Sequence, residues 1–223
     1  MAWVGLCQCK RGLAYFAALY SFWARPCGSK GRPAGRQFTT PSRSLENHSP
    51  SLTLVLGGAR SGKSRYAEAL TMASPAPWIY IATAEPFDDE MRARIAEHKD
   101  RRSDDWETVD APTDLAGAIE DAPEDCTVLV DCLTLWLNNL MFRKINIETA
   151  IENLETALAG REAPTVLVSN EVGFGIVPDN AEARRFRDLQ GRLNQRIAAM
   201  AGRVVLMVAG IPMLVKGEPG NQP

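Results

Sequence analysis

This 223-residue sequence contains few cysteines and carries little net charge. The five cysteines are an odd number without framework spacing, which argues against a secreted disulfide scaffold and favours a reducing cytoplasm. The net charge of −2 provides no basic field, so composition does not favour a nucleic-acid partner. The apolar run at residues 12–23 is about 12 residues, too short to predict a stable membrane span. The whole sequence is 45% apolar and 23% charged, an ordinary globular composition.

The first fifty residues differ in composition from the rest. They contain seven lysines and arginines against one acidic residue, Glu46, so they carry +6 and leave −8 for the remainder. Residues 28–51 are rich in Gly, Ser, Pro and Arg, which predicts a disordered basic extension over residues 1–51. A secretory signal is the disfavoured alternative, because no clean small-residue cleavage site follows the apolar run. A start codon placed too early is another reading, and the role of the segment stays open.

The remaining sequence alternates short apolar runs with helical patterns. This alternation predicts an α/β fold of the P-loop NTPase-like type, a mostly parallel β-sheet flanked by helices, over residues 52–216. Residues 217–223 are predicted to be a frayed tail. The predicted strands are 52–56, 78–82, 127–130, 165–169 and 204–209. The predicted helices are 63–72, 88–99, 133–142, 148–158 and 181–200.

One motif carries a definite chemistry. It fits G-x-x-x-x-G-K-[ST] and lies between a predicted strand and a predicted helix, the context in which such a loop wraps phosphates. Backbone N–H groups would point at phosphate oxygens, the lysine would reach the β- and γ-phosphates, and the last serine would bind Mg²⁺. The sequence therefore predicts a GTP or ATP site. The motif is Gly57, Gly58, Ala59, Arg60, Ser61, Gly62, Lys63 and Ser64.

Asp131 has two possible roles. It follows the predicted strand 127–130, where an acid in a P-loop fold holds Mg²⁺ directly or through water. It also lies just before the helix predicted from Leu133, where it would serve as an N-cap. The phosphate loop favours the metal-side role.

His98 is a candidate nucleophile. It lies in the last turn of the predicted helix 88–99 and precedes a charged run that finishes at Arg102, so a neutral imidazole there could attack a phosphate. A histidine at a helix C-terminus is also the ordinary complement of the helix dipole. The chemistry of the residues alone favours this second reading.

Several segments together resemble one family. The chain is similar to the bifunctional adenosylcobinamide kinase/adenosylcobinamide-phosphate guanylyltransferases of cobalamin biosynthesis over about residues 52–216, and residues 1–50 have no counterpart. The phosphate loop alone is weak support for this family, whereas the ordered set is specific. The segments are GGARSGKSR (57–65), IATA (81–84), DEM (89–91), RIAEHK (94–99), WETV (106–109), NEVG with GIVP (170–178), and FRD through NQ (186–195).

The resemblance implies two reactions. A nucleoside triphosphate first phosphorylates the aminopropanol hydroxyl of adenosylcobinamide. GTP then guanylylates His98, and adenosylcobinamide phosphate takes the GMP to give adenosylcobinamide-GDP. The resemblance reverses the ordinary reading of His98, and it also implies a homo-oligomer, specifically a trimer.

Site residues follow by the same resemblance. Asp110 and Asp131 stand where the family often has Glu, and either acid could accept hydrogen bonds from guanine. The loop 170–178 is a candidate corrinoid contact or an ordinary strand-to-helix connection. A single-activity P-loop kinase and a GTP-binding protein without transferase activity remain the alternatives. The nucleotide-site residues beyond the loop are Thr83, Ala84, Glu85, Lys99, Asp100, Arg101, Arg102, Asp110 and Asp131.

Overall fold

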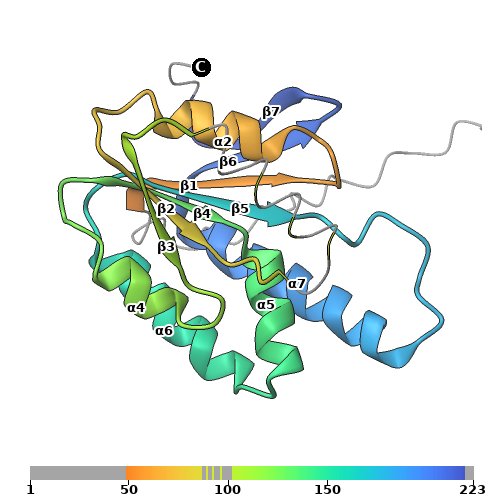
Figure 1. Ribbon diagram of the computed structural model, residues 1–223. Helices are drawn as coiled ribbons and strands as arrows, with labels where there is room; N and C mark the ends of the chain where they lie inside the picture. Colours follow the sequence, from red (N-terminus) through yellow and green to blue (C-terminus); the bar gives the residue numbers. More distant parts are fainter. Residues whose placement is uncertain (1–48, 87–88, 90–91, 93–95, 97–101, 219–223) are drawn as a thin grey trace, which may run out of the picture. The chain divides into compact units, whose positions relative to one another are not determined.

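A seven-stranded sheet organises the described residues, which in this computed structural model are 49–86, 89, 92, 96 and 102–218 (Figure 1). The strand order is β3-β2-β4-β5-β1-β6-β7, and every neighbouring pair is parallel except β6 and β7. The strands are β1 (Ser49–Gly57), β2 (Trp78–Ala82), β3 (Trp106–Asp110), β4 (Thr127–Asp131), β5 (Thr165–Asn170), β6 (Ala201–Val208) and β7 (Ile211–Lys216).

Helices cover both faces of the sheet. One face packs against α2, and the other packs against α4, α5, α6 and α7 (Figure 1). The central strands are buried on both faces because their residues are continuously apolar, as parallel strands between two helical layers require. The helices are α2 (Lys63–Thr71), α4 (Leu115–Glu120), α5 (Leu133–Phe142), α6 (Ile147–Gly160) and α7 (Ala181–Met200).

The predicted α/β fold with a mostly parallel sheet is confirmed. All five predicted strands are present, and the predicted helices at 133–142 and 181–200 match α5 and α7 at both ends. The apolar side of α7 lies in the core through Leu193 and Ile197. The strand predicted at 52–56 instead begins at Ser49, so residues 49–51 belong to β1 and not to the basic extension.

Three elements were not predicted. The edge strands β3 and β7 and the short helix α4 carry weak local signals: β3 is exposed at three of its five positions. The β6–β7 turn is Ala209-Gly210, with φ of 52° and 83°, and it lacks the Asn-Gly or Asp-Gly pair that marks such hairpins. Their structure depends on neighbours in the sheet more than on local sequence.

Three predictions fall wholly or partly on residues outside the described set, among them the frayed tail, of which residues 219–223 are outside it. Residues 1–48 are outside it, and so is most of the helix predicted at 88–99, of which Asp89, Arg92 and Ala96 are described and helical. Among the described helices, none combines the length and the apolar content needed to cross a membrane.

Candidate nucleotide-binding site

The phosphate loop makes the turn from β1 into α2. Arg60 and Gly62 take φ of 55° and 90°, the left-handed conformation that curls the backbone, and Ser61 N–H donates to the Gly58 carbonyl at 3.3 Å. A Cβ at Gly57 would lie 2.4 Å from Ser61 Oγ and 2.9 Å from the Met207 carbonyl oxygen. Only glycine therefore fits where the strand meets the loop.

Both neighbouring strands of β1 hold this loop. After β5, Glu171 N–H donates to the Gly57 carbonyl at 3.0 Å, and in the β6–β7 turn Gly210 N–H donates to the Ser61 carbonyl at 3.0 Å. The unpredicted β6–β7 hairpin thus supports the loop directly. Because the loop is held at both ends, its N–H groups are oriented for phosphate before a ligand binds.

Lys63 and Ser64 start α2. The N-cap, Gly62, offers no side-chain bond and the first turn contains no acidic residue, so the positive end of the helix dipole is left for an anion. Lys63 Nζ donates to the Gly58 carbonyl at 3.0 Å across the loop. These are the features by which a P-loop binds phosphates.

Asp131 projects toward the α2 face of the sheet. Leu129, two residues earlier in β4, packs in the cluster beneath α2, and alternate strand residues share a face. Asp131 Oδ2 accepts a hydrogen bond from the Tyr80 hydroxyl at 3.3 Å. The capping alternative for Asp131 is wrong, because the N-cap of α5 is Cys132. Its carboxylate therefore shares the sheet face on which Lys63 and Ser64 begin α2.

Asp110 shares this face. Trp106, four residues earlier in β3, packs against the cluster beneath α2, whereas Val109 packs on the opposite side. Asp110 and Asp131 both pair in register with Ala82 of β2, one from each side. Their Cα atoms are thus about 10 Å apart, two strand spacings. Asp110 is exposed and open to a ligand.

Thr83 is buried and fastens the ends of two strands. Its Oγ1 donates to the Cys132 carbonyl and accepts from the Cys132 N–H, both at 2.8 Å. Asn139 of α5 donates to the Thr83 carbonyl at 2.8 Å. The Thr83 hydroxyl is therefore occupied by the backbone, and the predicted nucleotide contacts of Thr83 and Ala84 stay predictions.

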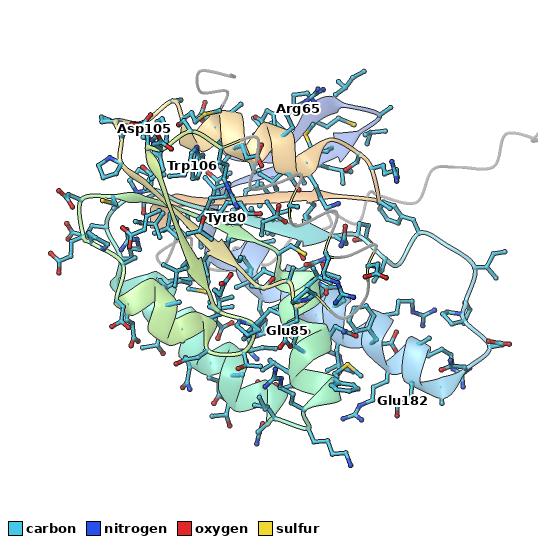
Figure 2. All side chains as sticks on the ribbon, viewed as in Figure 1. Arg65, Tyr80, Glu85, Asp105, Trp106 and Glu182 are labelled. Atoms are coloured by element: carbon cyan, nitrogen blue, oxygen red, sulfur yellow. The ribbon has the colours of Figure 1, made fainter. Side chains whose placement is uncertain are left out.

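Glu85 lies toward α5 instead of α2 (Figure 2). Its Oε1 accepts from Arg143, at the end of α5, at 2.5 Å, while Oε2 is buried without a hydrogen-bond partner among the described residues. The structure thus separates Glu85 from Asp131, which faces the other layer. Its role at the nucleotide stays a prediction.

Arg102 reaches the site through Tyr80. Its guanidinium carbon lies 3.6 Å from the centroid of the Tyr80 ring, and its Nη1 is buried without a hydrogen-bond partner in the described part of the chain. The other candidates of this segment lie outside the described residues: His98, Lys99, Asp100 and Arg101.

Mg²⁺ fits the donors that are available. Within the described residues no three His, Cys, Asp or Glu side chains cluster as a metal site. Magnesium at a P-loop needs few protein ligands, since phosphate oxygens and water supply the rest. The Ser64 hydroxyl and the Asp131 carboxylate are oxygen donors of that kind, and they share a sheet face.

Sequence reasoning missed three residues of this region: Tyr80, Asn139 and Arg143. Tyr80 lies inside an apolar strand run, and no local pattern singles out Arg143. Asn139 offered a signal, because an amide in a mostly apolar helix needs partners when it is buried. It bonds the carbonyls of Thr83 and Pro112.

The loop after β5 is anchored at its base and apolar at its tip. Asn170 N–H donates to Thr134 Oγ1 at 2.8 Å, and Asn194 of α7 donates to the Asn170 carbonyl at 3.0 Å. Phe174 and Ile176 at the tip are 84% and 98% exposed. The loop therefore presents apolar surface next to a strand that borders the phosphate loop.

Burial raises the pKa values of Cys132 and Tyr80. Burial raises the pKa of the Cys132 thiol from 9.0 to about 11, with the Asp131 charge adding to the shift. Burial, then the charge of Asp131, also raises the pKa of Tyr80 above its usual value. Both groups are therefore neutral near pH 7.

Cys132 should make the protein less stable at alkaline pH. The folded thiol keeps its proton to about pH 11 whereas the unfolded thiol loses it near pH 9, so its stabilising contribution is complete below pH 9 and is lost as pH rises through 11. The slope contributed is at most about 1.4 kcal/mol per pH unit. Urea unfolding between pH 8 and 11 should show a steeper loss for the wild type than for Cys132→Ala. An equal dependence of the unfolding free energy on pH in both proteins would contradict the raised pKa of Cys132 in the folded state.

Comparison with known proteins places this geometry in a family. Residues 53–215 match the model of the CobU family, described as cobinamide kinase / cobinamide phosphate guanyltransferase. The bifunctional adenosylcobalamin biosynthesis protein CobP of Pseudomonas aeruginosa is 46% identical over 169 residues, covering 74% of this chain and 98% of that protein. CobU of Salmonella typhimurium, with the same description, is 44% identical over 181 residues, covering 74% and 99%. A crystal structure of the RadB recombinase aligns with a TM-score of 0.45 at 13% identity, covering 79% of this chain and 84% of that one. The match to the family model over residues 53–215 and the identity to CobP and CobU show that the chain, with its phosphate loop and with Asp110 and Asp131 on the same face of the sheet, belongs to the cobinamide kinase / cobinamide phosphate guanyltransferase family.

Proposed function

We propose that this enzyme phosphorylates adenosylcobinamide with ATP or GTP and then transfers GMP from GTP, through a guanylyl-histidine at His98, to give adenosylcobinamide-GDP. The observation that supports this most is the common face shared by the phosphate loop and two acids. Lys63 and Ser64 begin the helix on that face, and Asp110 and Asp131 project toward it. Family membership supports a cobinamide as the substrate.

The first transfer moves the γ-phosphoryl group. The aminopropanol hydroxyl oxygen attacks the γ-phosphorus, the bond from that phosphorus to the β,γ-bridging oxygen breaks, and the nucleoside diphosphate leaves. The hydroxyl proton passes to water or to a nearby carboxylate. Lys63 and the loop N–H groups would hold the charge that develops on the phosphate oxygens.

The second transfer uses a covalent intermediate. A neutral His98 nitrogen attacks the α-phosphorus of GTP, a nitrogen–phosphorus bond forms, and pyrophosphate leaves. A phosphate oxygen of adenosylcobinamide phosphate then attacks the same phosphorus, and the bond to nitrogen breaks. The intermediate divides one difficult exchange between two phosphates into two easier steps.

Mg²⁺, when bound, would neutralise phosphate charge, and Ser64 and Asp131 are the residues proposed to hold it. Arg102 would contribute a further cation. It lies four residues after His98, so covalent geometry keeps the two Cα atoms within about 14 Å. Holding Arg102 at Tyr80 therefore limits how far the imidazole can lie from the phosphates.

The exposed tip of the loop 170–178 is proposed to contact the corrinoid. Its base bonds the carbonyl of Gly57, which places apolar surface beside the phosphate loop. We also propose a cytoplasmic homo-oligomer, a trimer by resemblance to the family. The exposed apolar residues of the edge strand β7, Ile211, Met213 and Val215, are compatible with such an interface.

Product formation tests the function. The full chain is incubated with adenosylcobinamide, GTP and Mg²⁺. The corrinoids are then separated and identified by mass spectrometry. We expect adenosylcobinamide phosphate first and adenosylcobinamide-GDP later, with both products absent in EDTA. Accumulation of the phosphate alone would indicate a single-activity kinase, and GTP binding without either product would indicate a binding protein; each result would overturn the bifunctional proposal.

A further inference from the structure

Tyr80 lies between two charged residues of the site. It is in the middle of β2, its side chain is 5% exposed, and it packs in the apolar cluster beneath α2. Its ring face carries a cation and its hydroxyl meets a carboxylate, contacts that packing alone does not require. Figure 2 labels it beside Trp106 of the neighbouring strand.

The ring face contacts Arg102. The guanidinium carbon is 3.6 Å from the ring centroid, well within the range in which an aromatic quadrupole attracts a cation, and burial strengthens this attraction. Trp106 meets the same ring edge-on, with centroids 6.2 Å apart, and Trp78 packs on Trp106 at 5.3 Å. The two indoles help to bury the ring, whereas the contacts to the guanidinium and to the carboxylate are made by Tyr80 itself.

The hydroxyl contacts Asp131. Tyr80 Oη donates to Asp131 Oδ2 at 3.3 Å, between neighbouring strands. Without the phenol, the guanidinium and the carboxylate would be free to approach and pair with each other, since opposite charges attract strongly where water is largely excluded. With the phenol in place, Nη1 of Arg102 stays without a hydrogen-bond partner among the described residues. An unpartnered buried N–H of a cation is suited to an anionic phosphate.

We infer that Tyr80 is a positioning residue of the nucleotide site, which holds Arg102 and Asp131 apart so that the guanidinium remains available to phosphate. The inference rests on the proposed function, because that function gives Arg102 and Asp131 their tasks. Tyr80 itself touches no reacting atom and acts through its two neighbours.

GTP affinity, measured by fluorescence titration of the full chain, tests this role. Tyr80→Leu removes both contacts and should weaken GTP binding about tenfold. Tyr80→Phe keeps the ring and loses the hydroxyl, so it should weaken binding about threefold. Trp106→Phe disturbs the same aromatic cluster without touching Arg102 or Asp131, and it should bind GTP like the wild type.

A double-mutant cycle separates positioning from general loosening. Arg102→Ala should weaken GTP binding in the wild type but should have little further effect in Tyr80→Leu, because the guanidinium is already misplaced there. Additive effects, wild-type affinity in Tyr80→Leu, or an equal loss in Trp106→Phe would each overturn the inference. A wild type that binds GTP but forms no cobinamide product would refute the proposed function while leaving the cycle informative. A wild type that does not bind GTP would overturn both.

Discussion

Lys63→Ala should abolish detectable GTP and ATP binding and lower both transfer rates about a hundredfold or more. Lys63 begins α2, directly after the loop whose backbone takes left-handed φ at Arg60 and Gly62. Its ammonium would stabilise the negative charge of the phosphates both in the bound nucleotide and in the transition state. A water molecule has no positive charge and cannot take over this role. Isothermal titration with each nucleotide and product assays with adenosylcobinamide measure the two effects.

Arg65→Ala is the matched control. Arg65 is a cation of the same helix, two residues further on, and its side chain is exposed (Figure 2). Removing it changes the net charge equally, so its nucleotide affinity should stay near the wild-type value. Thermal unfolding of both variants verifies that the fold persists. Unchanged GTP and ATP affinity in Lys63→Ala would refute the phosphate-loop assignment.

His98→Asn should eliminate covalent guanylylation of the protein. Incubation with GTP labelled at the α-phosphate should leave an acid-labile, alkali-stable label on the wild type, since a phosphoramidate forms when an imidazole takes the nucleotide. The variant should carry no label and form no adenosylcobinamide-GDP. The phosphorylation step needs no histidine-borne intermediate, so adenosylcobinamide phosphate should still accumulate.

His48→Asn provides the comparison, because the sequence has two histidines. It should be labelled as strongly as the wild type. Equal labelling of His98→Asn, or a wild type that takes no label while forming adenosylcobinamide-GDP, would show that the GMP passes to the substrate without this histidine. The kinase half of the proposal would be unaffected by that outcome.

The sequence alone determined the features that are local in the chain. The phosphate loop is contiguous, and its glycines, Lys63 and Ser64 follow from spacing between a strand and a helix. The continuous apolar runs predicted the buried parallel strands, because such strands are covered on both faces. The apolar side of α7 followed from helical periodicity.

Only the tertiary structure decided which distant residues meet. Tyr80 and Asp131 are 51 residues apart and touch because β2 and β4 are neighbours, an order that hydrophobic periodicity does not encode. The hairpin through Gly210 supports the phosphate loop for the same reason, since β6 lies beside β1. Pairing between strands depends on contacts across the whole sheet. A local pattern can therefore name the phosphate-binding residues, whereas the packed sheet decides which side chains surround them.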